Sequence, residues 1–362
     1  MIRLKYINDT KMIKLITKQQ KITAIILEKG KMQSSAVYAE IVKQGEDISL
    51  VTIKRALSEM ASVGVLVAAG SGRSTSYDIS SLGRIFAEVD AHKYCSLEPD
   101  KRYGLNRYNF DLLPGLKSDI FTTDELKILD SATSEYKKRT RDLPTTIQRK
   151  ELERLIIELS WKSSKIEGNT YTLLDTEKLI LENKAALGKT QQETQMILNH
   201  KDAFNFVREY TSQFKTITQP NLEELHAILV KDLSVDLGLR EKPVGVVGSV
   251  YRPLDNIYQI TEAINDLGAA VSQMSTPYAK ALIALLGIGY IQPFEDGNKR
   301  TSRLMANALL LAHGSAPLSY RSVDENDYRE AMLVFYELNS IVPFKKIFIT
   351  QYNFAAQNYA VK

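Results

Sequence analysis

The apolar residues of the C-terminal two-thirds of the chain recur at helical spacing, and this periodicity constrains the fold more than any other feature of the sequence. Beyond Thr123 the pattern is almost entirely helical. Asn221, with Glu224 three residues later, predicts a helix start, and Gly314 predicts a helix end. The pattern predicts a mainly α fold, a helical bundle with helices over residues 126–134, 147–166, 173–187, 191–210, 222–233, 260–274, 278–290, 298–313 and 327–338.

One strand-like segment interrupts these helical patterns, at residues 243–254. Val and Tyr alternate there around Gly248 and Ser249, which is the pattern of a β-hairpin. We therefore expect a hairpin inserted between two helices of the bundle.

The N-terminal part of the chain differs from the rest in charge. A chain of 362 residues has room for two or three domains. Residues 1–80 hold about twelve Lys and Arg against about seven Asp and Glu, although the whole chain carries only +4, so the remainder is close to neutral. We predict a small basic α+β domain over residues 1–80, a connector over 81–120 and a helical domain over 121–362.

The basic N-terminal piece reads as three short helical patterns followed by two strand-like runs around a Gly-Ser-Gly-Arg turn. This order resembles a winged helix-turn-helix, with a recognition helix over residues 49–63, capped by Ser49, and a wing tip at 70–74. Such a fold binds DNA, and the residues that would contact it are Thr52, Lys54, Arg55 and Arg73. The alternative is a small domain that mediates protein contacts.

Cysteine content and hydropathy indicate in which cellular compartment the protein works. The single cysteine, Cys95, allows no intramolecular disulfide, and we interpret it as an inert thiol in a cytoplasmic protein. The first residues lack an apolar signal region, and the longest apolar run, 281–291, is too short to span a membrane. His200, His226 and His313 lie in amphipathic helices without a second ligand at metal spacing, so we assign them structural roles.

The stretch Ile-Gln-Pro-Phe-Glu-Asp-Gly-Asn-Lys-Arg-Thr-Ser-Arg at residues 291–303 concentrates phosphate-binding chemistry between two helices. Gly297 and Asn298 open the second helix, whose first N–H groups and dipole favour an anion. Arg300 and Arg303 share a face of that helix, so both can reach one polyphosphate. Asp296 is placed to hold Mg²⁺ on that polyphosphate. A solvated cluster of charges is the alternative, and composition alone favours it.

The order of these residues resembles the signature of the Fic (filamentation induced by cAMP) family, His-Pro-Phe-x-(Asp/Glu)-Gly-Asn-(Gly/Lys)-Arg-x-x-Arg. The resemblance extends over roughly residues 120–355. It implies transfer of AMP from ATP to a Ser, Thr or Tyr hydroxyl of a target protein, with Mg²⁺ at Asp296 and with a homodimer as one assembly. The nucleotide would be held by Gly297, Asn298, Lys299, Arg300 and Arg303.

The same resemblance assigns a role to the predicted hairpin. In the family it is a flap that clamps an extended segment of the target protein by strand addition. The corresponding residues here are Val246, Val247, Gly248, Ser249, Val250 and Tyr251.

Two residues depart from the pattern. Gln292 stands where the family has the histidine that takes the proton of the target hydroxyl, and an amide cannot accept a proton near neutral pH. We therefore expect weakened or absent transfer with nucleotide binding retained. Lys299 makes this stretch similar to that of the toxin kinases of the family, which move a phosphoryl group. Arg303 nevertheless favours nucleotidyl transfer.

An acidic residue upstream predicts autoinhibition. Ser163, Glu167 and Gly168 close the helical pattern that begins near residue 147, and they resemble the family's inhibitory motif (Ser/Thr)-x-x-x-Glu-(Gly/Asn). The resemblance implies that Glu167 pairs with Arg303 and occupies the place of the γ-phosphate. From the residues alone, a structural salt bridge is the alternative. For the whole chain the alternatives are a non-catalytic nucleotide sensor that regulates DNA binding and a phosphotransferase.

Overall fold

The computed structural model of the chain describes residues 15–116 and 120–361. It divides into two compact units. One unit contains the described part of Met1–Lys117 together with Gly245–Arg252 and Asn326–Lys346, and the other contains the described part of Ser118–Val244 with Pro253–Glu325 and Ile347–Lys362. The predicted domain boundaries at residues 80 and 120 stay predictions.

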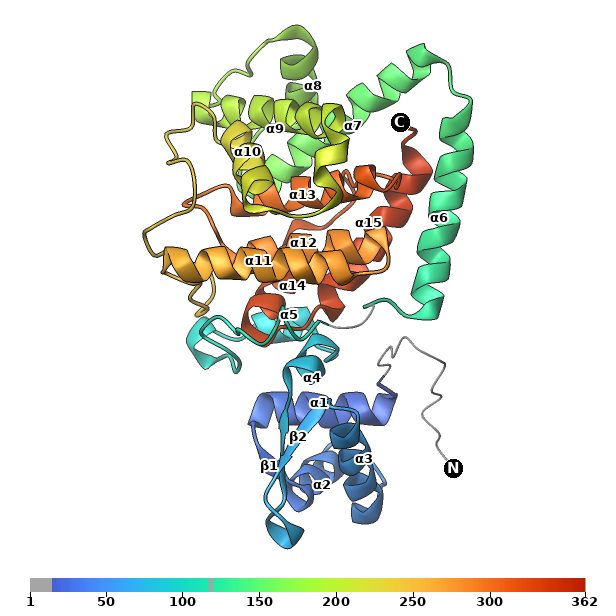
Figure 1. The fold of residues 1–362 in the computed structure, drawn as a ribbon, viewed down its shortest axis with the longest axis vertical. Coiled ribbons are helices and arrows are strands. Elements are labelled where there is room, and N and C mark those ends of the chain that lie inside the picture. Colours follow the sequence, from blue (N-terminus) through green and yellow to red (C-terminus); the bar gives the residue numbers. More distant parts are fainter. Residues whose placement is uncertain (1–14, 117–119, 362) are drawn as a thin grey trace. The chain divides into compact units, whose positions relative to one another are not determined.

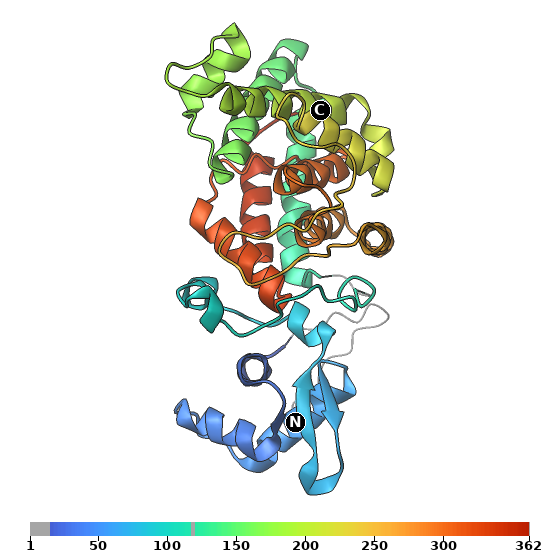
Figure 2. The ribbon, with the colours of Figure 1, turned by 90° about the vertical axis from the view of Figure 1, so that its left-hand side faces the viewer.

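The N-terminal unit begins with three helices and a small sheet (Figure 1). The helices are α1 (Thr17–Lys29), α2 (Ser34–Lys43) and α3 (Leu50–Ser62). The strands β1 (Met32–Gln33), β2 (Leu66–Ala69) and β3 (Ser76–Ile79) pair antiparallel in the order β1-β3-β2. The β2–β3 hairpin turns through a short 3-10 helix, η1 (Gly72–Ser74), and Figure 2 shows this hairpin in light blue with its turn at the free end. The predicted three helices and two later strands are therefore confirmed, whereas β1, between α1 and α2, was not predicted.

Helix α3 presents an apolar face to the core of this unit. The Ser49 side chain accepts a hydrogen bond from the backbone N–H of Thr52 at 3.2 Å, so the predicted N-cap is confirmed. Ile53 and Leu57 are fully buried in a cluster with residues of α1, α2 and the sheet. Lys54 and Arg55 are exposed, and Arg55 Nε lies 3.4 Å from Glu59 Oε1 one turn on.

The remaining elements of this unit are short except for one helix. Residues 81–101 form α4 (Ser81–Ile85), α5 (Ala91–Cys95) and η2 (Pro99–Lys101). Helix α14 (Glu325–Leu338) contributes Val334 and Leu338 to the apolar core. Chain segments that are far apart in sequence therefore share one core.

The second unit is helical. Its elements are α6 (Thr123–Arg141), α7 (Thr145–Ile166), α8 (Leu173–Glu182), α9 (Gln191–Glu209), η3 (Thr211–Lys215), α10 (Gln219–Leu229), α11 (Ile257–Gln273), α12 (Pro277–Ile291), α13 (Asn298–Ala312) and most of α15 (Val342–Asn358). Helix α12 is apolar all round and is buried along almost its whole length, between α11 and α13 (Figure 1). Among the described helices none is long and apolar enough to span a membrane.

Each predicted helix of the C-terminal two-thirds is present, with differences at the ends. The helix expected from residue 222 begins at Gln219, because Thr218 caps it and Asn221 is the N3 residue of that capping box. The helix expected over 173–187 ends at Glu182, because Asn183 adopts a left-handed conformation with φ +55°. Helix α15 was not predicted.

The predicted hairpin over residues 243–254 is wrong. No strand forms within this segment of the described chain, although a turn occurs near Gly248. Its polar groups bond elsewhere: Arg252 N donates to Asn106 O at 3.0 Å, and the Ser249 hydroxyl donates to Glu337 Oε1 at 2.5 Å. Arg252 N, a backbone group that a hairpin ladder could use, therefore has its partner outside the segment.

Candidate functional site

The loop that begins at Gln292 and leads into the first turns of α13 joins two buried helices of the helical unit. Helix α12 ends at Gln292, which has the left-handed backbone angles φ +52° and ψ +60°. Helix α13 begins after Gly297, which is also left-handed at φ +79° and offers no side chain as a cap. The first N–H groups of α13 are therefore left for another acceptor, which is the arrangement of an anion site at a helix N-terminus.

Asn298 holds the loop in shape. Its Oδ1 atom accepts from Phe294 N at 2.8 Å, and its Nδ2 atom donates to Phe294 O at 2.7 Å. Both side chains are buried. Because these two bonds occupy both Oδ1 and Nδ2 of the Asn298 side chain, any contact of this residue with a nucleotide must come from its backbone N–H.

His226 supports the loop from α10, a contact that the sequence analysis missed. Its ring stacks on Phe294 with centroids 3.7 Å apart and planes 6° apart. Burial lowers the pKa of His226 to about 4, so the ring is neutral and Nε2–H donates to Asp296 O at 3.0 Å. A Cβ at Gly297 would lie 3.1 Å from Val230 Cγ1 and 3.4 Å from the His226 ring. Glycine is therefore required both by its positive φ and by this packing.

Gln292 points its amide back toward its own helix. Nε2 donates to Gly289 O at 2.6 Å, and the residue is only 7% exposed. This bond satisfies a carbonyl of the last turn of α12. The predicted catalytic position is thus occupied by a side chain that caps a helix.

Arg240, which no motif singled out, ties the loop to the start of the 243–254 segment. Its Nε atom donates to Gln292 O at 2.6 Å and its backbone N to Pro293 O at 3.0 Å. Nη1 donates to Lys242 O at 2.9 Å and Nη2 donates to Leu254 O. One buried guanidinium thereby joins both ends of the segment to the backbone of Gln292.

Arg300 and Asp296 form an ion pair at the edge of the loop. Arg300 Nη2 lies 2.7 Å from Asp296 Oδ2, and the side chains are 2% and 65% exposed. Arg300 Nη1 is buried and has no hydrogen-bond partner within the described residues. Burial lowers the pKa of Arg300, although a guanidinium stays protonated at neutral pH. A buried cation with an unused donor is suited to an anion.

Arg303 lies on the next turn of α13 and is fully buried. Nη1 donates to Glu167 Oε1 at 2.9 Å, while Nε and Nη2 donate to the hydroxyl and carbonyl oxygens of Ser163, both at 2.8 Å. Gly168, at φ +95°, ends the helix that carries both partners. The structure therefore brings Ser163 and Glu167 together with Arg303.

Glu167 is the acidic centre of a group of three cations. Its Oε2 atom lies 3.6 Å from Lys299 Nζ. Burial alone would raise the pKa of Glu167, but the charges of Arg303, Lys299 and Arg300 outweigh burial and hold it below its ordinary value. Glu167 is therefore a carboxylate at neutral pH, and it neutralises part of the charge that an anion would otherwise meet.

The other predicted site residues lie in the N-terminal unit. Val246, Val247, Gly248, Ser249, Val250 and Tyr251 belong to it, as do Thr52, Lys54, Arg55 and Arg73. The residues that the structure brings together around the loop are Ser163, Glu167, Gln292, Asp296, Gly297, Asn298, Lys299, Arg300 and Arg303.

A helical unit with a buried central helix that ends in this loop defines a Fic-type helical domain. Residues 216–310 match the model of the Fic/DOC family, and the chain carries a domain of that family. A protein adenylyltransferase Fic of Nematostella vectensis is 31% identical over 174 residues, and one of Drosophila willistoni is 31% identical over 156 residues. These matches cover 47% and 42% of this chain but only 41% and 31% of the relatives, so the chain spans about two fifths or less of their length.

Solved structures share the fold. Fic-1 (residues 134–508) from C. elegans superposes with a TM-score of 0.55 at 20% identity, covering 65% of this chain and 71% of that one. A Fic family protein from Desulfovibrio desulfuricans G20 gives a TM-score of 0.54 at 21% identity, covering 66% of this chain and 75% of that one.

Proposed function

We propose that this chain binds ATP with Mg²⁺ at the loop of residues 292–303 and is a protein adenylyltransferase held in a restrained state. The reaction would transfer AMP from ATP to the hydroxyl of a Ser, Thr or Tyr side chain on a target protein. Glu167 restrains it by occupying the place of the γ-phosphate, and Gln292 weakens it by removing the proton acceptor.

The observation that carries the proposal is the bonding of Arg303. Arg303 lies on the second turn of α13, and its fully buried guanidinium is a strong ligand for a terminal phosphate. In this structure Glu167 bonds Nη1 at 2.9 Å. A carboxylate and a phosphate oxygen compete for the same donor, so relief of inhibition requires Glu167 to leave Arg303.

The donors of the loop fit ATP and Mg²⁺. The unused Nη1 of Arg300 and the uncapped start of α13 offer hydrogen bonds to phosphate oxygens. Among the described residues no group of three or more His, Cys, Asp and Glu could hold a metal ion. Mg²⁺ is typically held by one or two carboxylates together with substrate phosphates, and Asp296 offers an exposed carboxylate for that purpose. Bound there, Mg²⁺ would neutralise phosphate charge.

Gln292 limits the reaction by what its side chain lacks. An amide cannot take the proton of an attacking hydroxyl. A positioned general base is typically worth about 10²–10⁴ in rate, so its absence should cost about 3–5.5 kcal/mol of barrier stabilisation. The phosphate contacts proposed above do not involve the Gln292 side chain, so nucleotide binding can persist without it.

A labelling experiment separates this proposal from its rivals. The full chain is incubated with ATP labelled at the α- or the γ-phosphate, in wild type, in Glu167→Gly, and in Glu167→Gly combined with Gln292→His. Label from α-phosphate on protein supports adenylyl transfer, and label from γ-phosphate alone supports a phosphotransferase that uses Lys299. ATP binding by calorimetry without label in any variant supports a non-catalytic nucleotide sensor.

A second function is supported by the N-terminal unit. We infer that residues 15–80 form a winged helix-turn-helix that binds DNA, with α3 in the major groove and the β2–β3 hairpin as the wing. The supporting observation is that Thr52, Lys54 and Arg55 lie on the face of α3 away from its buried residues, with Arg73 in the exposed turn of the hairpin. A gel shift of duplex DNA by the full chain at low salt tests this inference.

A further inference from the structure

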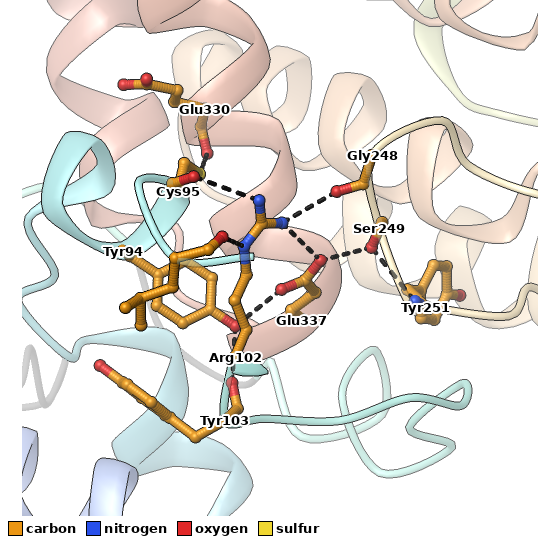
Figure 3. Close-up of polar contacts among 10 residues, drawn as sticks. Tyr94, Cys95, Arg102, Tyr103, Gly248, Ser249, Tyr251, Glu330 and Glu337 are labelled. Atoms are coloured by element: carbon orange, nitrogen blue, oxygen red, sulfur yellow. Dashed lines mark hydrogen bonds and ion pairs between the residues drawn. The ribbon is translucent and has the colours of Figure 1, made fainter. Parts of the chain in front are cut away.

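The tip of the 243–254 segment is fixed by a buried ion pair within the N-terminal unit (Figure 3). The side chains of Arg102 and Glu337 are 6% and 1% exposed, and Arg102 Nη1 lies 3.3 Å from Glu337 Oε1. The same Nη1 donates to Gly248 O at 2.9 Å, and the Ser249 hydroxyl donates to the same carboxylate at 2.5 Å. Each partner of the ion pair therefore also bonds the segment.

Both members of the pair are themselves held firmly. Arg102 Nε donates to Leu97 O at 3.0 Å and Nη2 to Cys95 O at 3.2 Å, so the guanidinium is fixed to the chain that precedes it. The Tyr94 hydroxyl donates to Glu337 Oε2 at 2.7 Å. The guanidinium of Arg102 is fixed by these bonds, so its bond to Gly248 O must break if the segment moves.

The segment itself has little internal structure to hold it. Two bonds lie within it: Ser249 N donates to Val246 O at 3.1 Å in a turn, and Tyr251 N donates to the Ser249 hydroxyl at 3.1 Å. Val247 is 96% exposed. Without a strand ladder, the segment is held by contacts from outside: Tyr251 stacks on Tyr336 and Arg252 N donates to Asn106 O, while the tip at Gly248 and Ser249 bonds Arg102 and Glu337.

We propose that the Arg102–Glu337 pair is a latch that controls whether the 243–254 segment can be captured by an extended peptide. With the latch closed, Gly248 O and the Ser249 hydroxyl are occupied by the pair. With it open, the backbone of the segment becomes available for strand addition by a peptide of extended conformation. The proposal rests on the proposed function, because that peptide would be part of the protein substrate.

The latch lies outside the residues that match the Fic/DOC family. That match covers 216–310, whereas Arg102 follows the N-terminal helices and sheet and Glu337 lies on α14. A regulator that acts on the residues around Arg102 could therefore change substrate access without touching the loop of residues 292–303.

Hydrogen exchange measured by mass spectrometry on the full chain tests the latch. The variants are Arg102→Lys, which keeps the charge but loses the fork, Ser249→Ala, which removes a bond to Glu337, and Lys101→Ala as the exposed neighbouring control. Because Ser249→Ala also removes the acceptor of Tyr251 N, the amide of Tyr251 is left out of the comparison. Because a hydrogen bond to a charged group is worth about tenfold or more in a local opening equilibrium, we expect exchange within 245–252 to rise about tenfold in the first two variants and not in the control.

A protease supplies the probe for capture, since proteases bind their substrates as extended strands. Thermolysin should cleave before Val246, Val247 or Val250 faster in Arg102→Lys and Ser249→Ala than in wild type. Unchanged exchange and cleavage in Ser249→Ala, which leaves the ion pair intact, would overturn the latch, even if Arg102→Lys lowers the overall stability. Neither measurement uses ATP, so ATP binding by calorimetry reports separately on the proposed function.

Discussion

Glu167 Oε1 accepts a hydrogen bond of 2.9 Å from Nη1 of Arg303, a residue 136 positions later in the chain. The guanidinium is fully buried, while the carboxylate is 20% exposed. Of the two side chains only that of Glu167 reaches solvent, so we expect the acid and not the base to move. This asymmetry makes Glu167 the movable partner of the pair.

Glu167→Gly should destabilise the nucleotide-free protein and improve ATP binding. Removing one partner of a buried ion pair typically costs about 3–5 kcal/mol, and the value here should lie near the lower limit because Ser163 still bonds Arg303. ATP at a hundredfold excess over its Kd should restore about 2.7 kcal/mol. Thermal unfolding with and without ATP measures both effects.

Glu182→Gly is the matched control, since Glu182 also ends a helix but pairs with exposed Lys184. It should cost no more than about 1 kcal/mol and leave the response to ATP unchanged. Equal responses of the two variants to ATP, with equal calorimetric affinities, would remove the inhibitory role of Glu167.

Gln292→His in the Glu167→Gly background should raise AMP transfer by about 10²–10⁴. The nucleotide affinity should barely change, because the proposed phosphate contacts come from α13 and its N-terminus. Gln292→Ala is the control that removes the bond to Gly289 O without adding a base. It should lower the free energy of unfolding but not raise the rate of AMP transfer. Equal transfer by the Gln and His proteins would show that another group or water deprotonates the target.

DNA binding by the N-terminal unit should depend steeply on salt. Affinity for duplex DNA should fall as salt rises, and Arg55→Ala combined with Arg73→Ala should reduce the slope of log affinity against log salt by about 2. Lys178→Ala, an exposed change on α8 of the helical unit, is the control and should leave the slope unchanged. Absence of any shift at low ionic strength would favour a domain for protein contacts.

Stability should fall as the pH is lowered from 6.5 toward 5. Burial lowers the pKa of His200 to about 3 and that of His226 to about 4, so the folded protein resists protonating rings that the unfolded chain protonates near pH 6.5. The unfolded state then binds more protons, and each ring should remove about 2 kcal/mol over this range. Urea unfolding at several pH values measures the slope.

Substituting each buried histidine shows how much of the pH dependence of stability that ring causes. His200→Gln and His226→Gln should each make the stability less dependent on pH by about one proton. Glu167 does not contribute to the slope between pH 6.5 and 5. Because its pKa is lowered in the folded protein, its stabilising contribution is lost only as the pH falls below the ordinary carboxyl range. A slope that is unchanged in both variants would contradict the buried, neutral state of these rings.

Local sequence signals predicted the helices well because their causes are local. Helices α9 and α13 have apolar residues at helical spacing, α12 is a continuous apolar run, and Ser49 caps α3 through its own side chain. The start of α10 was misplaced because two adjacent candidates for capping, Thr218 and Asn221, are both used in one capping box.

Long-range contacts could not be read from sequence. The alternation in 243–254 fits a hairpin, yet Gly248 O accepts from Arg102 Nη1 and Arg252 N donates to Asn106 O, so these backbone groups bond outside the segment. His226 and Arg240 hold the loop through one ring stack and several carbonyl bonds, and neither carries a motif. The motif residues themselves were found because the loop is contiguous in sequence, so its chemistry is visible without the fold.

The left-handed backbone at Gln292 has a genetic consequence. Only a few residues other than glycine accept such angles readily, and histidine is among those enriched there, whereas β-branched residues are strongly disfavoured. Glutamine and histidine codons differ only in their third base. A lineage carrying this chain therefore stands one point mutation from a residue that suits the backbone of the α12 cap and restores a proton acceptor, and no second change in the fold has to come first.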